Sequence, residues 1–183
     1  MSRILSRAAL ALLATVAAAA CEDEPLSPDA GWSGAEDVAV EANVEAGPAD
    51  RRAIRDIVRT FDEAWTAGDP VRYAAQYAGA DFVGPDGAVL TDPAAITGLY
   101  TALFTFVFPN TTRRSSIRNL TFLTGRIAVL DIDTRVKGFE SLPPGIVPWR
   151  PRVLRALEKN VLVKRRGEWR IVQHQQTLLA PES

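Results

Sequence analysis

Apolar residues recur at spacings of three and four over residues 51–67, which predicts an amphipathic helix. Asp69-Pro70 follows with the order of a capping residue and a first-turn proline, which predicts the start of a second helix. Asp92-Pro93 repeats this signal before a third apolar stripe, which ends at Pro109-Asn110. The apolar side of the second helix is expected to carry Val71, Tyr73, Ala74 and Tyr77.

The second half of the chain is rich in β-branched and aromatic residues, which predicts strands. The long strands are expected at residues 113–125, 126–139, 155–166 and 168–179. Two short segments around Pro85-Asp86-Gly87, residues 80–83 and 88–90, predict a hairpin. Residues 140–151 contain four prolines and must form a loop, in which Trp149 is either the anchor of a lid or a surface plug. Helices on one face of a mostly antiparallel sheet give an α+β fold.

The first twenty residues have the pattern of a signal peptide. Arg3 and Arg7 precede an uncharged run over residues 8–20, which is shorter than the roughly 20 residues of a membrane span. The run ends at Cys21, the only cysteine, so no internal disulfide can form. Cys21 is either the lipidated first residue of a bacterial lipoprotein, although Ala18 replaces the usual Leu, or an incidental thiol. We favour the first, which predicts an exported cell-envelope protein held to the membrane only through a lipid anchor.

Residues 21–49 form an acidic block that separates the signal peptide from the predicted domain, residues 50–183. The block has eight Asp and Glu and no Lys or Arg, a composition typical of a disordered tether. The domain keeps 19 of the 21 Lys and Arg and 14 of the 22 Asp and Glu, a net charge of about +5. This falls short of the dense basic surface of nucleic-acid-binding proteins, so no nucleic-acid partner is expected.

The order helix, helix, hairpin, helix and four long strands resembles the nuclear transport factor 2-like superfamily, and within it the SnoaL-like and SgcJ-type domains. Two stretches carry the resemblance, FDEAWTAGDPVRYAAQYAGADFVGPDGAVL at 61–90 and VLVKRRGEWRIVQHQQT at 161–177. It covers about residues 50–180 and implies a cone-shaped domain, with three N-terminal helices packed on a curved sheet around an apolar pocket. These motifs are specific for the fold and weak for activity.

The resemblance also allows a comparison with ketosteroid isomerases of this fold. Those enzymes use an Asp as general base, with a Tyr and a protonated Asp as oxyanion donors. Phe61 falls at the Tyr position, Pro85 near the base and Asn160 at or beside the buried acid. Phenylalanine has no hydroxyl and proline cannot titrate, so isomerase chemistry of that kind is not expected.

His174 is the only histidine. A two-residue period turns it away from Trp169 and Ile171, the expected core anchors, unless a β-bulge between Ile171 and His174 reverses it. With one histidine and one cysteine the chain lacks a cluster with metal-ligand spacing, so neither a metal nor a cofactor is expected. Asp131 and Asp133 share a strand face with Arg135, which we interpret as an exposed or dimer-facing ladder paired with arginines of the neighbouring strand.

Three functional hypotheses follow. The first is binding of a small apolar or aromatic molecule in the pocket, without established catalysis. The second is an enzyme of isomerase, cyclase or hydratase type, with His174 as acid/base and Asn160 as oxyanion donor. The third is a protein-interaction module, and a homodimer through the sheet face is expected. The other side chains expected to line the pocket are Trp65, Tyr73, Tyr100, Phe104 and Gln176.

Overall fold

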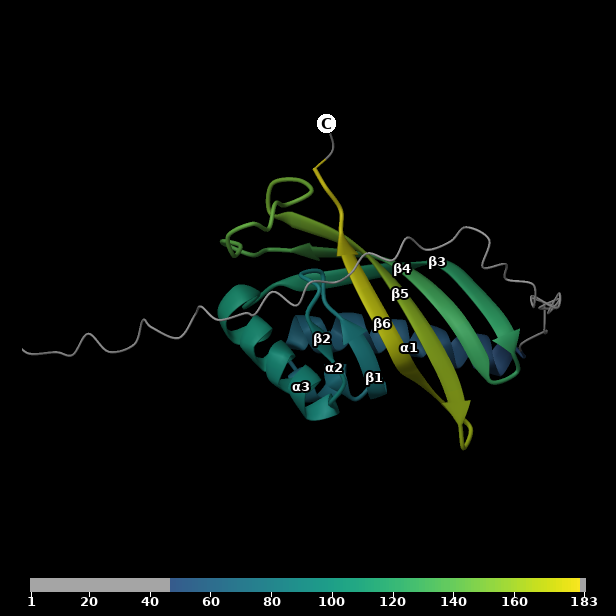
Figure 1. Ribbon diagram of the computed structural model, residues 1–183. Helices are drawn as coiled ribbons and strands as arrows, with labels where there is room; N and C mark the ends of the chain where they lie inside the picture. The colour runs from purple at the N-terminus through teal and green to yellow at the C-terminus, as the bar shows by residue number, and fades with distance from the viewer. Residues whose placement is uncertain (1–46, 182–183) are drawn as a thin grey trace, which may run out of the picture. The chain divides into compact units, whose positions relative to one another are not determined.

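The first predicted helix is α1 (Pro48–Ala67) in the computed structural model, which describes residues 47–181 (Figure 1). Its buried side chains are Ile54, Ile57, Val58, Phe61, Ala64 and Trp65, the apolar positions of the sequence pattern. Gly68 ends the helix at a φ of 64°, a conformation that costs glycine little because it has no Cβ. The helix begins two residues before the predicted domain boundary, with Pro48 in its first turn.

The second helix, α2 (Pro70–Ala74), is shorter than its sequence pattern predicted. The Asp69 carboxylate caps it by accepting a hydrogen bond from the Arg72 backbone N–H at 2.9 Å. Val71 is 67% exposed and Tyr77 lies in the following strand, so the prediction that both face the apolar side of this helix is wrong. After Ala75 the Gln76 carbonyl accepts a hydrogen bond from the Ile171 N–H at 3.0 Å, which joins the chain to the last strand.

The third helix, α3 (Pro93–Ala102), passes into a π-helical turn, η1 (Leu103–Val107). Three threonine hydroxyls, of Thr97, Thr101 and Thr105, donate to the carbonyl four residues earlier, a bond that tends to bend helices. The Phe108 N–H donates to the Leu103 carbonyl at 2.7 Å, five residues back. The sequence pattern predicted one uninterrupted helix here, and it contained no signal for this wider turn.

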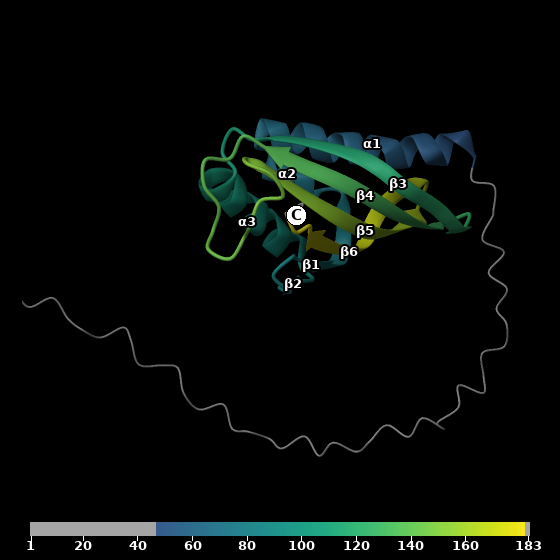
Figure 2. The same ribbon diagram turned by 90° about the horizontal axis from the view of Figure 1, so that it is seen from above.

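The described residues form one six-stranded sheet in the order β2-β1-β6-β5-β4-β3. The strands are β1 (Tyr77–Val83), β2 (Val89–Leu90), β3 (Thr112–Thr124), β4 (Ile127–Lys137), β5 (Val153–Arg165) and β6 (Glu168–Leu178). The β1–β2 hairpin is antiparallel as predicted, and β3 to β6 form an antiparallel meander. Only β1 and β6 are parallel among these pairs. The sheet is curved, α1 runs along β3, and the shorter helices α2 and α3 lie near one end of the sheet (Figures 1 and 2). The α+β prediction is confirmed.

A β-bulge at Val172 reverses the side-chain alternation of β6. Leu162 of β5 pairs with Ile171, whereas the adjacent Val161 pairs with Gln173, so Val172 is an extra residue. His174 therefore points to the same face as Trp169 and Ile171, and all three are buried. Of the two orientations left open by the sequence, the structure has the one that requires the bulge.

The signal peptide, Cys21 and all but the last three residues of the predicted tether lie outside the described residues. No helix among residues 47–181 is long and apolar enough to span a membrane.

Candidate functional site

An apolar cavity of about 660 Å³ lies at the end of the sheet that carries the short helices. The helical segment α3–η1 contributes Leu99, Leu103 and Val107, and the facing strands contribute Leu154, Ala156 and Leu178. The β1–β2 turn adds Pro85 and Asp86. A volume of this size lies within the range of roughly 300–1,000 Å³ typical of small-molecule sites.

The proline-rich loop between β4 and β5 forms another part of the cavity wall through Pro143, Pro144 and Ile146. Trp149 does not line the cavity. Its ring lies among three guanidinium groups, at 5.6 Å from Arg135, 4.3 Å from Arg150 and 5.0 Å from Arg155. Contacts of this kind stabilise an aromatic ring at a surface. Trp149 therefore anchors the loop that borders the cavity.

Three of the predicted lining residues, Trp65, Tyr100 and Gln176, do line the cavity. Tyr73 and Phe104 are buried directly behind it: Tyr73 is 4.0 Å from Tyr100 and Phe104 is 5.2 Å from Trp65, between ring centroids. Helical spacing places an aromatic residue on the core side of its helix, but it cannot separate a side chain that reaches the cavity from one packed behind another ring.

Successive cross-strand pairs of β5 and β6 show how far each residue lies from the loop end of the domain interior. From the loop end inward they are Ala156 with Leu178, Glu158 with Gln176, and Asn160 with His174. Each step is two residues, or about 7 Å along a strand. The cavity extends to Gln176, whereas His174 and Asn160 form the next pair inward and do not line it.

His174 is held in the core by three neighbours. Its Nδ1 is 2.8 Å from Asn160 Oδ1, and its ring stacks on Phe82 at 4.6 Å and meets Tyr77 edge-on. Burial lowers the pKa of His174 to about 4, against a smaller opposing effect of Glu158, so the imidazole is neutral at pH 7. With Asn160 Oδ1 as acceptor the proton is on Nδ1, and Nε2 has no partner among the described residues.

A buried ion pair that the sequence analysis missed lies beside the cavity. Arg113 Nη2 donates to both carboxylate oxygens of Glu158 at 2.9 Å and to Thr134 Oγ1 at 3.1 Å. Arg113 and Glu158 are 1% and 3% exposed. Glu158 lies two residues before Asn160 on the same face of the strand. This alternation is the sequence pattern that indicates a buried Glu158.

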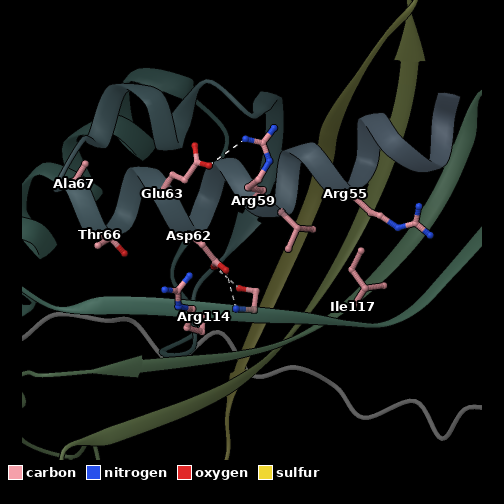
Figure 3. Close-up of a pocket in the computed structure, with 10 residues that line it drawn as sticks. Arg55, Arg59, Asp62, Glu63, Thr66, Ala67, Arg114 and Ile117 are labelled. Carbon is pink, nitrogen blue, oxygen red and sulfur yellow. Dashed lines mark hydrogen bonds and ion pairs between the residues drawn. The ribbon is translucent and has the colours of Figure 1, made fainter.

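A second hollow, of about 730 Å³, is a groove between α1 and the edge strand β3 (Figure 3). Asp62 crosses it and accepts hydrogen bonds from the Ser115 N–H at 2.9 Å and hydroxyl at 2.7 Å. Glu63 accepts a hydrogen bond from Arg59 at 3.1 Å. Asp62 therefore satisfies a backbone N–H group that points outward from the edge strand. This structural role explains the position of Asp62, and no ligand needs to be invoked.

Comparisons with solved structures identify the fold. A domain of unknown function with a cystatin-like fold from Nostoc punctiforme is 23% identical over 74% of this chain and 80% of its own, with a TM-score of 0.63. A ketosteroid isomerase-like protein from Erwinia carotovora is 15% identical over 74% of this chain and 100% of its own, with a TM-score of 0.59. An NTF-2 like protein of unknown function from Shewanella oneidensis is 14% identical over 70% of this chain and 98% of its own, with a TM-score of 0.57. The domain has the nuclear transport factor 2-like fold. No family model and no curated protein matches the chain.

Three residues were matched by the sequence resemblance to the catalytic positions of ketosteroid isomerases, and the structure shows the surroundings of each. Phe61 is fully buried against Tyr73, with ring centroids 4.6 Å apart. Pro85 lines the cavity, and Asn160 is bonded to His174 below it. Of the three positions only Pro85 lines the cavity, and proline has no ionisable side chain.

The outer face of the sheet carries the predicted charge ladder in part, because Asp133 is buried in this monomer and Asp131 pairs with a lysine instead of an arginine. Asp133 accepts from Arg155 at 3.0 Å, and Lys159 Nζ is 2.6 Å from Asp131. Arg155 holds the pKa of Asp133 below its usual value. The homodimer through this face stays a prediction. Residues 47–181 contain no group of three or more His, Cys, Asp or Glu side chains arranged to hold a metal ion.

Proposed function

We propose that this protein is an exported, lipid-anchored SnoaL-like domain protein that binds a small apolar or aromatic molecule in its cavity. The observation that carries the proposal is the cavity of about 660 Å³, in which aliphatic, aromatic and proline side chains predominate. Binding there would remove apolar ligand surface from water, which contributes about 25 cal/mol per Å².

The acid/base alternative has less support than binding. His174 and Asn160 are within hydrogen-bonding distance of each other, as an acid/base pair would need. However, Phe82 covers the His174 ring and the side chain is only 1% exposed. A general base must come within hydrogen-bonding reach of the proton that it removes, directly or through one water molecule. Gln176, which reaches the cavity, has no ionisable group.

Ala156→Trp is expected to reduce binding of the neutral fluorophore N-phenyl-1-naphthylamine at least 10-fold. Ala156 lies between Thr134 and Leu178 in the sheet, and all three line the cavity. An indole at this position would therefore occupy the space of the ligand. The measurement is a fluorescence titration of the two proteins at equal concentration.

The matched control is Thr177→Trp, because Thr177 is exposed on the opposite face of the sheet. This variant should bind the fluorophore like the unsubstituted protein. If the unsubstituted protein fails to bind it, or if both tryptophan variants bind equally well, the cavity is not a binding site.

The proposed membrane anchor requires cleavage before Cys21. Mass spectrometry of the protein from bacterial membranes should find an N-terminal cysteine that carries acyl chains, and Cys21→Ser should be released into the soluble fraction. An unmodified Cys21, or an N-terminus at another residue, would contradict the lipoprotein.

A further inference from the structure

We propose that the cavity selects ligands with a neutral carbonyl or hydroxyl group, which Gln176 binds at the inner end. This inference rests on the proposed function and specifies the chemical class of the ligand. The inference depends on which polar groups face the cavity and on which of them already form hydrogen bonds within the protein.

Most polar side chains of the cavity have partners within the protein. Trp65 Nε1 donates to Thr111 Oγ1 at 2.9 Å, and Thr134 Oγ1 accepts from Arg113 at 3.1 Å. The hydroxyls of Tyr100 and Tyr73 interact with each other. Asp86 Oδ1 accepts from the Ala88 N–H at 3.1 Å within the β1–β2 turn.

The Gln176 carboxamide is different, because it has no side-chain hydrogen bond to any residue in 47–181. It is half-buried, and the bulge at Val172 turns it inward beside Glu158. A carboxamide offers both N–H donors and a carbonyl acceptor. It can therefore bind a ligand carbonyl through its N–H groups or a ligand hydroxyl through either atom.

Charged ligand groups have no suitable counter-ion in the cavity. None of the residues that line it in the described part of the chain is Lys, Arg or His, and the ionisable carboxylate among them, Asp86, is at the exposed turn. Behind the wall, Arg113 binds both carboxylate oxygens of Glu158 and lies 3.7 Å from Asp62, and none of these three charged side chains lines the cavity. Burying an unpaired charge is costly, whereas a neutral carbonyl needs one good donor.

The order of the β5–β6 pairs from the loop end inward also sets the orientation of the ligand. Gln176 lies one pair further in than Leu178, and the segments beyond Leu178 toward the loop contribute Pro143, Pro144 and Ile146. The polar group of the ligand therefore enters first, and its apolar part lies against the loop and α3–η1.

The test uses four naphthalenes with one skeleton and different substituents, each displacing N-phenyl-1-naphthylamine from the mature full-length chain. They are 2-ethylnaphthalene, 2-acetylnaphthalene, 2-naphthoate and protonated 2-naphthylmethylamine. The neutral ketone should bind about 3- to 10-fold more tightly than the hydrocarbon, as expected for one net hydrogen bond. The carboxylate and the ammonium compound should bind more weakly than both.

Gln176→Leu should reduce the ratio of ketone to hydrocarbon affinity to about one. This ratio is measured within one protein, so a general change in stability cancels. Gln175→Leu, on the outer face of the same strand, should preserve the ratio, and circular dichroism checks that both variants are folded. An unchanged ratio in Gln176→Leu, or tightest binding of the carboxylate or ammonium compound, would overturn the inference while leaving the proposed function intact. Failure of the fluorophore itself to bind would overturn both.

Discussion

Glu158→Gln is expected to lower the free energy of unfolding by about 3 kcal/mol, the lower end of the range for a broken buried ion pair, because the Arg113 guanidinium keeps only the more distant Asp62 carboxylate, 3.7 Å from its Nη1. Burial has the largest single effect and lowers the pKa of Arg113, but Glu158, Tyr73, Asp62 and Tyr100 together raise it. A guanidinium is not deprotonated in proteins, so the arginine stays charged in the variant. Urea denaturation followed by circular dichroism at pH 7 measures the loss.

Glu168→Gln is the control for this measurement. Glu168 also pairs with an arginine, Arg170 at 2.9 Å, but its side chain is 69% exposed. An exposed pair contributes about 0–1 kcal/mol, so this variant should remain close to the unsubstituted protein. If the two variants lose similar stability, the Arg113–Glu158 pair is not acting as a buried charge pair.

A double variant separates the contribution of the pair from the cost of an unpaired charge. Arg113→Met with Glu158→Met removes both charges and retains apolar volume. It should regain much of the stability lost in Glu158→Gln, because paired buried charges are often no more stabilising than apolar replacements. A double variant less stable than Glu158→Gln would mean that the ion pair itself stabilises the fold.

Acidification should destabilise the protein through His174 by about 3 kcal/mol between pH 7 and pH 4. The pKa of His174 is about 4 in the folded protein, from a usual value of 6.5. Between these values the unfolded chain binds a proton that the folded protein does not. The free energy of unfolding therefore falls as the pH drops from about 6.5 to 4, and this contribution is constant below pH 4.

The comparison that isolates this effect is His174→Gln, whose side chain does not titrate. Protonation of carboxylates with lowered pKa values, such as Asp50 and Asp133, also reduces the free energy of unfolding in acid, but it does so in both proteins. The difference in unfolding free energy between the two proteins should therefore change with pH only in the window from 6.5 to 4. A difference that is constant across this window would mean that His174 is not buried in the neutral form.

The elements of the fold were predictable because each has a local cause. The apolar spacing of residues 51–67, the Asp-Pro starts of the next two helices and the β-rich segments after residue 112 all correspond to observed elements. Two errors of detail were not avoidable from local patterns. Just after helix α2 the backbone bonds to Ile171, which is distant in the sequence, and the π-helical turn at η1 has no sequence signal.

The candidate site was less predictable because its geometry depends on register. A single unpaired residue in β6 decides the orientation of His174, and the sequence allowed both orientations. The resemblance points to Asn160, whereas Glu158 is indicated only by the alternation of the same strand, two residues earlier. The relation of each side chain to the cavity depends on packing between α3–η1, the loop and the sheet, which no single segment encodes.

The bulge at Val172 divides the last strand into two parts with different surroundings. Trp169 and Ile171, before the bulge, are part of the hydrophobic core, while Gln176 and Leu178, after it, line the cavity. Under the proposed function, substitutions at Gln176 and Leu178 would change ligand preference without altering the core anchors Trp169 and Ile171. Apart from the buried His174, core packing and ligand selection would then be separate tasks of one strand.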